Sequence, residues 1–316
     1  MSTVLVMMLV GMFALMGLSL PVSFSIGISA ILALVIKGGI PLAMVPQKMF
    51  GAMNSFLMLS IPLYIVVGDL MVEGKISERL VKFANCLVGW MKGSMVYVTF
   101  TTAAFFGAIS GSAAATTYAI GGMMYPEMVK VKYHPPFAAA CSAACGTLGV
   151  LIPPSVPLLV FGAITGTSVA SLFAYGAIGG IVVMICYMIG GRLELAYSRT
   201  EVSTTRVPSL REFWLAFKEA FPGLLAPAII LGGIYGGAFT ATEAGVVAVV
   251  YVIFIGLFIY KDLTFEKIVR ALVKSGISTA CILLIVSCAS VFSWLSTIEG
   301  LARIMADLVT RVGLSK

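Results

Sequence analysis

Long apolar runs separated by short polar turns dominate this chain. The nearly uncharged runs lie at 4–20, 22–36, 56–71, 170–190, 222–239, 244–260 and 275–297. A helix of about 20 apolar residues crosses the roughly 30 Å of hydrocarbon in a bilayer, so the pattern predicts a bundle of membrane-spanning helices. We expect the two short runs at the start to be hinged at Pro21, which lacks an amide hydrogen.

Two charged segments have one apolar helical face each. In 75–92 the apolar positions are Ile76, Leu80, Phe83, Ala84, Leu87 and Met91. In 301–314 they are Leu301, Ile304, Met305, Leu308 and Val312. Amphipathic helices of this kind lie in the membrane interface rather than across it. We also expect a short helix within 41–54 and a second surface helix around 213–217, inside the polar stretch 192–221.

Two apolar segments in the middle of the chain are interrupted. Segment 93–126 carries no charge, but Ser110 and Gly111 divide it into two arms that are each too short to span a bilayer. It is predicted to be a re-entrant hairpin. Segment 136–164 is predicted to be a helix broken at Pro153 and Pro154. Non-helical backbone at membrane depth must be buried in protein or line a cavity, so the two breaks together indicate a binding site.

Composition supports the same fold class. The chain is 60% hydrophobic and 10% charged, which is typical of an all-α polytopic membrane protein whose main surroundings are the lipid bilayer. The net charge of +7 would suit nucleic acid in a soluble protein, but loop placement explains it here, and we expect no nucleic-acid partner. The six cysteines fall mostly in apolar runs and are predicted to be free thiols.

Basic residues orient the predicted bundle. When the polar loops are placed on alternating sides, 15 of the 20 Lys and Arg residues share one side, and the other five are Lys37, Lys48, Arg303, Arg311 and Lys316. The richer side is cytoplasmic by the positive-inside rule. We therefore expect a periplasmic N terminus and a hairpin that enters from the cytoplasm.

An internal repeat divides the chain. Val72, Glu73 and Gly74 precede the first amphipathic helix as Ile298, Glu299 and Gly300 precede the second. Three runs and a surface helix thus recur on opposite sides of the membrane, which is the inverted repeat of secondary transporters. We expect residues 1–92 to form scaffold helices and an amphipathic arm helix, and residues 93–190 to form half of a transport core that includes a span at 170–190. Residues 191–221 are expected to be a cytoplasmic linker. Residues 222–316 should form a second set of scaffold helices with its own arm helix. The second repeat is expected to be incomplete, with its half of the core missing.

Three motifs resemble the large membrane subunit of tripartite ATP-independent periplasmic (TRAP) transporters. They are Phe-Gly-Ala-Ile-Ser-Gly-Ser-Ala at 106–113, Leu-Ile-Pro-Pro-Ser-Val-Pro at 151–157 and Gly-Ala-Phe-Thr-Ala-Thr-Glu-Ala at 237–244, with support from 46–50 and 60–63. Ala241 stands where the family often has proline. The resemblance implies an elevator-type, sodium-driven importer in the bacterial inner membrane. It also implies a small membrane subunit and a periplasmic binding protein that delivers an organic acid, namely a C4-dicarboxylate, a keto acid or a sugar acid.

The interrupted segments offer oxygen ligands for sodium as the coupling ion, with no other cofactor expected. Hydroxyls and unwound carbonyls suit this hard cation. The predicted ion-binding residues are Ser110, Gly111, Ser112, Thr116, Gly149 and Ile152. The positive ends of helix dipoles beside the second break would attract a substrate carboxylate. The predicted substrate-binding residues are Ser112, Pro153, Pro154 and Ser155. The alternative is that Gly111, Ser112 and Ala113 are small residues selected for close helix packing.

Other titratable residues are weaker candidates. Asp69 and Glu243 lie near the ends of predicted spans, where both can reach the interface. Glu243 follows Thr240 in what would be a first helical turn, so capping is favoured over ion or proton coupling. His134, the only histidine, lies in a polar turn and is expected at the surface.

Alternative functions remain open at this point. An intramembrane serine protease would need a histidine at membrane depth, and His134 is the only one in the chain. An aspartyl protease would need a second intramembrane aspartate beside Asp69. We therefore expect no enzymatic activity. The remaining alternatives are a partner-free sodium/dicarboxylate symporter and a non-transporting fragment of a permease.

Overall fold

The computed structural model describes residues 3–197 and 207–311, and every regular element in these ranges is helical. Six helical segments are long and apolar enough to cross a membrane: Phe56–Glu73, Pro135–Thr165, Val169–Tyr197, Leu210–Tyr235, Ala241–Ile259 and Phe265–Ile298. The prediction of an all-α polytopic membrane protein is confirmed. The chain forms two compact units, one made of residues 1–55 and 277–316 and the other of residues 56–276.

The first unit contains α1 (Thr3–Gly17), α2 (Val22–Lys37), α3 (Met44–Met53), the second part of α14 (Phe265–Ile298) and α15 (Leu301–Arg311). The turn between α1 and α2 contains Pro21, as predicted. The core of this unit includes Leu5, Met8, Leu34 and Leu295, none of which is more than 1% exposed. Part of the predicted apolar face in 301–314, including Val312, lies outside the residues whose side chains the structure describes.

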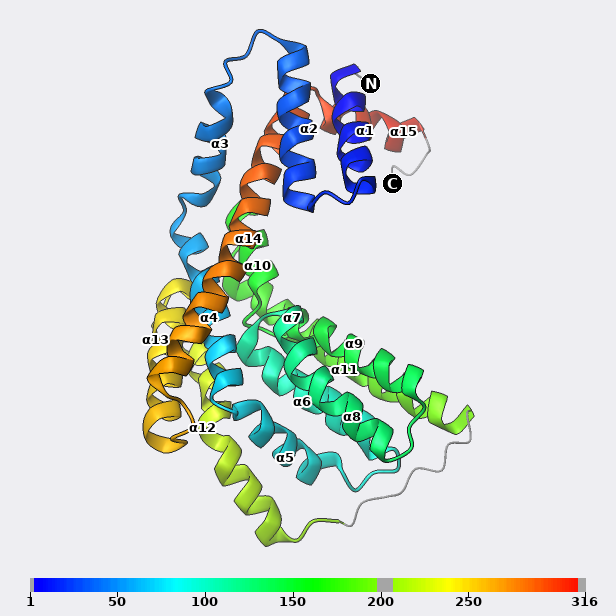
Figure 1. Ribbon diagram of the computed structural model, residues 1–316, viewed down its shortest axis with the longest axis vertical. Helices are drawn as coiled ribbons and strands as arrows, with labels where there is room; N and C mark the ends of the chain where they lie inside the picture. Colours follow the sequence, from blue (N-terminus) through cyan, green and yellow to red (C-terminus); the bar gives the residue numbers. More distant parts are fainter. Residues whose placement is uncertain (1–2, 198–206, 312–316) are drawn as a thin grey trace. The chain divides into compact units, whose positions relative to one another are not determined.

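The second unit contains the two interrupted segments. Its first helices are η1 (Phe56–Leu59), α4 (Ser60–Glu73) and α5 (Ile76–Val88). The hairpin consists of α6 (Ser94–Ser110), α7 (Ala113–Thr116), η2 (Thr117–Gly121) and α8 (Gly122–Lys130). The broken helix consists of α9 (Pro135–Leu151) and α10 (Val156–Thr165). Next comes α11 (Val169–Tyr197), and Figure 1 shows α6, α8, α9 and α11 running side by side.

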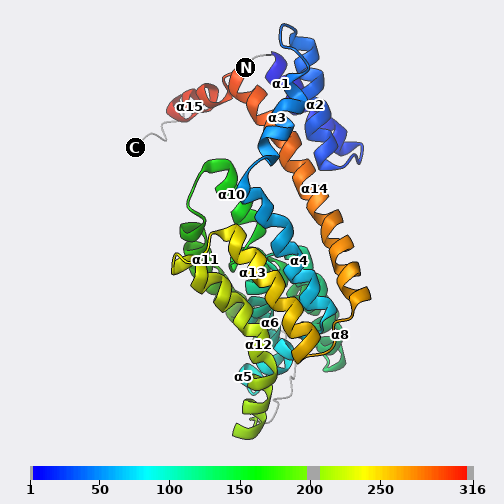
Figure 2. The ribbon, with the colours of Figure 1, turned by 90° about the vertical axis from the view of Figure 1, so that its left-hand side faces the viewer.

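Three further helical segments complete the second unit. They are α12 (Leu210–Tyr235), α13 (Ala241–Phe254) with its continuation η3 (Ile255–Ile259), and the beginning of α14. Helix α13 packs against α4 and α12 (Figure 2). Tyr64 Oη donates a hydrogen bond to the Ala241 carbonyl at 2.8 Å, and Thr242 Oγ1 donates to the Phe56 carbonyl at 3.0 Å. These contacts join the N-terminal ends of α4 and α13.

Helix α5 buries the apolar face that the sequence predicts. Ile76, Leu80 and Ala84 are fully buried, whereas Lys82 is exposed on the opposite side. The ring of Phe83 lies between α6 and α12, with its centroid 5.9 Å from Phe105 and 5.6 Å from Phe217. Packing against these two helices therefore positions α5.

The two glutamates of the internal repeat, Glu73 and Glu299, both form ion pairs. Glu73, at the end of α4, lies 4.0 Å from Arg270 of α14. Glu299, after α14, pairs with Lys37 at the end of α2. Each glutamate of the predicted repeat thus pairs with a basic residue from the other copy.

The predictions for two helices need correction. A surface helix around 213–217 and a span at 222–239 were expected as separate elements, but they form the continuous helix α12. It begins at a capping box in which Glu212 N–H donates to Ser209 Oγ at 3.2 Å and Ser209 N–H donates to Glu212 Oε2 at 2.6 Å. The span expected to begin at residue 275 begins ten residues earlier, at Phe265, after Thr264 caps α14 by accepting from Lys267 N–H at 3.4 Å.

Helix α12 continues through Pro222. A tyrosine hydroxyl bridges two backbone groups of α12 at this point and takes the place of one hydrogen bond within the helix. Tyr260 Oη donates to the Glu219 carbonyl at 2.8 Å and accepts from Gly223 N–H at 3.1 Å. Those two backbone groups would otherwise pair with each other in a regular helix. One turn away, Tyr251 Oη donates to the Pro222 carbonyl at 2.8 Å. Burial raises the pKa of Tyr260 to about 12, so its hydroxyl stays protonated at neutral pH.

Replacing Tyr260 with phenylalanine tests this bridge. The Tyr260→Phe variant should lose about 1–3 kcal/mol of unfolding free energy, because two hydrogen bonds, each worth about 0.5–1.5 kcal/mol, are removed. Thermal unfolding in detergent would measure the loss. Tyr175→Phe, which changes a tyrosine that is 75% exposed on α11, is the matched control and should leave the midpoint unchanged. Equal midpoints for the two variants would contradict a bridging role for Tyr260.

Candidate functional site

The tip of the hairpin is a tight turn built from one glycine and one serine. Helix α6 ends where Gly111 adopts φ +59°, and Gly111 N–H donates to the Gly107 carbonyl at 3.0 Å. Glycine takes this left-handed conformation without steric cost. Ser112 is extended and caps the second arm, its Oγ accepting from Ala115 N–H at 3.3 Å. The chain therefore reverses direction within two residues.

The second break, at 152–155, separates α9 from α10. Neither Pro153 nor Pro154 has an amide hydrogen with which to continue α9. The peptide bond between them is cis. Ser155 is extended and fully buried, and its Oγ accepts from Leu158 N–H at 3.5 Å. Helix α10 therefore starts from a serine cap, as the second arm of the hairpin does.

The two breaks contact each other directly. Val156 N–H donates to the Gly111 carbonyl at 3.0 Å. A β-carbon on Gly111 would lie 2.5 Å from the carbonyl oxygen of Pro154. Only glycine fits this position, because both the left-handed backbone and the close carbonyl exclude a side chain. Of the predicted residues, the structure brings Gly111, Pro154 and Ser155 together at this contact.

Hydroxyl and carbonyl oxygens gather beside the hairpin tip. Ser110 Oγ and Thr116 Oγ1 are 3.1 Å apart, and both residues are fully buried. A β-carbon on Gly149 of α9 would lie 2.2 Å from Thr116 Oγ1 and 2.8 Å from the carbonyl oxygen of Ser112. The predicted residues Ser110, Ser112, Thr116 and Gly149 therefore surround one small region, which we call the oxygen cluster. None of these four residues carries a formal charge.

Two predicted residues lie at the edge of this arrangement. The side chain of Ile152 packs on α11, where a β-carbon on Gly180 would lie 2.5 Å from its Cγ1. Pro153 is buried next to it. The first amides of α10 are already engaged, because Val156 N–H bonds to Gly111, Leu158 N–H bonds to Ser155, and Pro157 has no N–H. A carboxylate at this break would therefore meet serine hydroxyls before free helix amides.

Several close-packed residues near the tip were not predicted. A β-carbon on Gly146 of α9 would lie 2.5 Å from Thr117 Oγ1, and one on Gly107 of α6 would lie 2.9 Å from Gly149 Cα. On α4, a β-carbon on Gly68 would lie 2.9 Å from Ser110 Cβ. The spacing of Gly146 and Gly149, which places them on one helical face, was the signal available in the sequence.

Asp69 is buried in an ion pair that the sequence did not predict. It is 5% exposed, with Lys274 Nζ 2.9 Å from Oδ1 and Ser275 Oγ donating to Oδ2 at 2.7 Å. Lys274 Nζ also lies 5.4 Å from the ring centroid of Tyr118 in η2. Helix α14 covers Asp69, so its carboxylate is paired with Lys274 and Ser275 rather than open to solvent. This pair links α4 and α14 to the second arm of the hairpin.

Glu243 caps α13. Its N–H donates to Thr240 Oγ1 at 3.3 Å, and Thr240 N–H donates to Glu243 Oε2 at 2.8 Å. This reciprocal pair is a capping box, so the capping prediction is confirmed. No group of three or more His, Cys, Asp or Glu side chains suited to a metal ion occurs in the described part of the chain.

Comparison with known proteins decides the family. Residues 9–316 match the family described as "Tripartite ATP-independent periplasmic transporter, DctM component". The chain belongs to this family. The match supports the resemblance given by the three motifs, and it identifies a transporter permease subunit rather than an enzyme. Together with the six apolar helices, it indicates a multi-pass protein of the inner membrane.

Three relatives illustrate the extent of the similarity. The sialic acid TRAP transporter large permease protein SiaM of Vibrio cholerae is 35% identical over 94% of this chain and 69% of its own length. The C4-dicarboxylate TRAP transporter large permease protein DctM of Rhodobacter capsulatus is 32% identical over 96% and 72%, respectively. The isethionate TRAP transporter permease protein DctMQ of Oleidesulfovibrio alaskensis is 35% identical over 95% and 47%.

Adding a methyl group at Gly149 tests the close packing of the oxygen cluster. Gly149→Ala should cost about 1–3 kcal/mol of unfolding free energy, because Thr116 and the Ser112 carbonyl leave no space for it. Thermal unfolding gives the measurement. The matched control is Gly122→Ala in α8, where a β-carbon meets nothing within 4 Å and the change should be neutral or slightly stabilising. Equal stability of the two variants would refute the packing at Gly149.

A double-mutant cycle tests the buried ion pair. Lys274→Gln should destabilise the protein more than Asp69→Asn, because it leaves a buried carboxylate without its cation. Asp69→Asn instead keeps an oxygen that Ser275 can bond. We expect the two changes together to cost less than the sum of the single changes, with a coupling of roughly 0.5–3 kcal/mol. Purely additive losses of unfolding free energy would show that the two side chains do not interact.

Proposed function

We propose that this chain is the large permease subunit of a sodium-driven TRAP transporter that imports an organic anion. Family membership supports the permease role. The single structural observation that carries the rest of the proposal is the oxygen cluster, which lies where the hairpin tip contacts the break between α9 and α10. In secondary transporters, substrate and coupling ions bind at discontinuous helices of this kind.

The ligands available in the oxygen cluster suit sodium. Ser110 Oγ and Thr116 Oγ1 would bind the ion together with the Ser112 carbonyl and backbone carbonyls near Gly149 and Ile152. Gly111 would keep the turn tight enough to bring them together. The two hydroxyls bond to each other at 3.1 Å, and an ion between them would replace that hydrogen bond. The absence of any acidic side chain among these predicted ligands favours a monovalent cation over calcium, which usually takes carboxylates.

The substrate is proposed to bind at the adjoining serines. Ser112 is half-buried, and because its Oγ accepts from Ala115 N–H, its own hydroxyl hydrogen is available to a carboxylate. Ser155 is placed similarly across the contact but is fully buried, while Pro153 and Pro154 would form the wall. The relatives named for sialic acid, C4-dicarboxylates and isethionate all handle organic anions. This shared property supports an anionic cargo, whether a C4-dicarboxylate, a keto acid or a sugar acid.

The remaining parts of the proposal concern assembly and movement. A small membrane subunit and a periplasmic binding protein would complete the transporter, as the tripartite family description implies. Charge placement supports a periplasmic N terminus.

We propose elevator-type movement, in which the hairpin and the broken helix move as half of a transport core, the other half being a further segment of the second repeat. Tyr118 lies against Lys274 of α14, so this contact would change during such a movement.

Sodium-dependent uptake tests the proposed function. The full-length gene product would be reconstituted in proteoliposomes with its small subunit and binding protein, and uptake of labelled organic acids would be measured. Thr116→Val and Ser110→Ala should each raise the sodium concentration for half-maximal uptake by roughly tenfold, because loss of one oxygen ligand costs about 1–3 kcal/mol. Ser171→Ala, at an exposed position of α11, is the control.

Other outcomes would replace parts of the proposal. Uptake that persists without sodium would overturn the coupling ion. Uptake by the permease without the binding protein would favour a partner-free symporter. No uptake by any combination, despite correct folding, would favour a non-transporting fragment.

A further inference from the structure

A charged cavity of about 610 Å³ lies between α5, α12 and the turn after η3, away from the oxygen cluster. Its volume falls within the range of small-molecule binding sites. Residue 75, directly before α5, lines it together with residues 78, 79 and 82 of α5, and α12 lines it with residues 215, 218, 219 and 222. Both sets follow the spacing of a single helical face. The cavity is therefore an open groove between two facing helices, with residues 259, 260 and 262 also in its lining.

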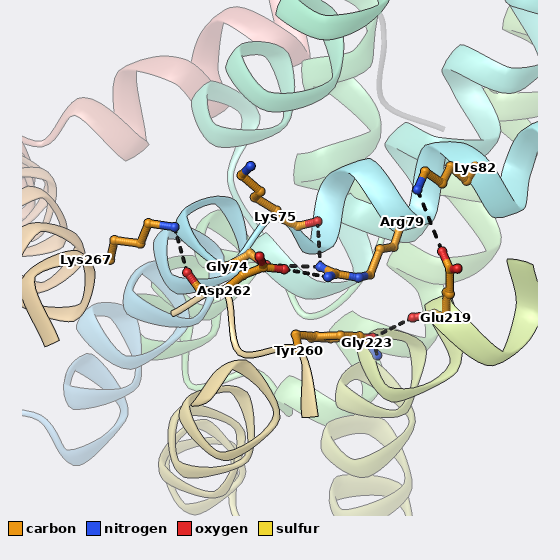
Figure 3. A network of polar contacts seen from close by, with 9 residues as sticks. All are labelled: Gly74, Lys75, Arg79, Lys82, Glu219, Gly223, Tyr260, Asp262 and Lys267. Carbon is orange, nitrogen blue, oxygen red and sulfur yellow. Dashed lines mark hydrogen bonds and ion pairs between the residues drawn. The ribbon is translucent and has the colours of Figure 1, made fainter. Parts of the chain in front are cut away.

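Arg79 forms a fixed wall of this cavity. Its guanidinium donates to Asp262 Oδ2 at 2.5 Å and to the carbonyls of Gly74 and Lys75 at 3.3 and 3.2 Å (Figure 3). It also lies 4.0 Å from the centre of the Tyr260 ring, at the distance of a cation–π contact. Because its charge is already compensated by Asp262, Arg79 shapes the site rather than supplying a free cation.

Within the described part of the chain, two lysines of the cavity are not engaged in ion pairs. Among the residues that the structure describes, the ammonium groups of Lys75 and Lys218 have no hydrogen bond or ion pair. Lys82 lies 3.8 Å from a Glu219 carboxylate oxygen, and Glu78 stands one turn before it on α5. The cavity wall has four cationic and three anionic side chains, which leaves a net charge of +1. A phosphodiester, with its single negative charge, would neutralise it.

Part of the rim of the cavity is apolar. Leu215 of α12 and Ile259 of η3 line the cavity and are 55% and 51% exposed. Trp214, next to Leu215, is 67% exposed, and tryptophan is enriched where membrane spans meet the interface. A ligand that joins a phosphate to hydrocarbon chains would use both parts of the site. A soluble anion would use only the lysines.

We propose that this cavity binds the headgroup of an anionic glycerophospholipid from the membrane. Lys75 and Lys218 would hold the phosphodiester, and the acyl chains would leave past Leu215 and Ile259. Basic pockets between membrane helices are suited to such headgroups. A bound lipid would join α5 to α12 and would stabilise the position of α5. The proposal depends on the chain being a membrane protein and is independent of sodium coupling.

The test uses the full-length protein, purified in detergent and depleted of lipid. Phosphatidylglycerol, phosphatidylethanolamine and phosphatidylcholine with identical acyl chains would be added separately, and binding would be measured by native mass spectrometry and thermal unfolding. Phosphatidylglycerol should bind at least roughly tenfold more tightly than phosphatidylcholine, because two lysines contact its anionic headgroup. It should also raise the unfolding midpoint. Inorganic phosphate at the same concentration should have no effect on the midpoint.

Paired lysine variants locate the site. The double variant Lys75→Gln/Lys218→Gln should lose this selectivity but keep its lipid-free unfolding midpoint, since neither ammonium group has a partner to lose. Lys92→Gln/Lys132→Gln, which removes two exposed lysines outside the cavity, is the matched control and should bind as the unaltered protein does. Equal binding of all three lipids, or unchanged selectivity in the cavity variant, would overturn the proposal. Binding of inorganic phosphate as tight as that of phosphatidylglycerol would assign the cavity to a soluble anion instead.

Discussion

A helix break inside a bilayer frees backbone groups that lipid cannot satisfy, and in this protein one hydrogen bond joins a freed donor of one break to a freed acceptor of the other. Val156 N–H, at the start of α10, donates to the Gly111 carbonyl at the tip of the hairpin. The serine caps, Ser112 and Ser155, accept further amides on either side. Because the break at 152–155 supplies a donor to the hairpin tip and the tip supplies the acceptor, each break stabilises the observed conformation of the other.

The close approach that this pairing requires also creates the oxygen cluster. Glycines at 107, 111 and 149 allow backbone to lie against backbone, and in doing so they bring the hydroxyls of Ser110 and Thr116 and the carbonyl of Ser112 into one small region. The two interpretations of the small residues, close packing and ion binding, are therefore compatible. Packing concentrates uncharged oxygens without a carboxylate, and that arrangement offers a hard monovalent cation several ligands at little electrostatic cost to the empty site.

Much of this arrangement could be predicted from the sequence, for identifiable reasons. The two breaks were predictable because proline and glycine act locally, and the amphipathic character of α5 was predictable from its periodicity. The Asp69–Lys274 pair was not, since its partners are 205 positions apart and no local pattern joins them. The continuity of α12 was also missed, because Pro222 normally ends a helix. The hydrogen bonding that Pro222 disturbs is restored by Tyr260, which reaches α12 only in the folded protein.

Tyr260 connects two features of the second unit. Its hydroxyl lies in the hydrogen-bond ladder of α12 at Pro222, while its ring lies against the Arg79 guanidinium of α5. Arg79 in turn bonds to Asp262, two residues beyond the tyrosine. The continuity of α12 through Pro222, the position of α5 and the shape of the charged cavity thus share one set of contacts. Since the rings of Tyr260 and Phe83 both join α5 to α12, we expect these two helices to move together rather than slide past each other.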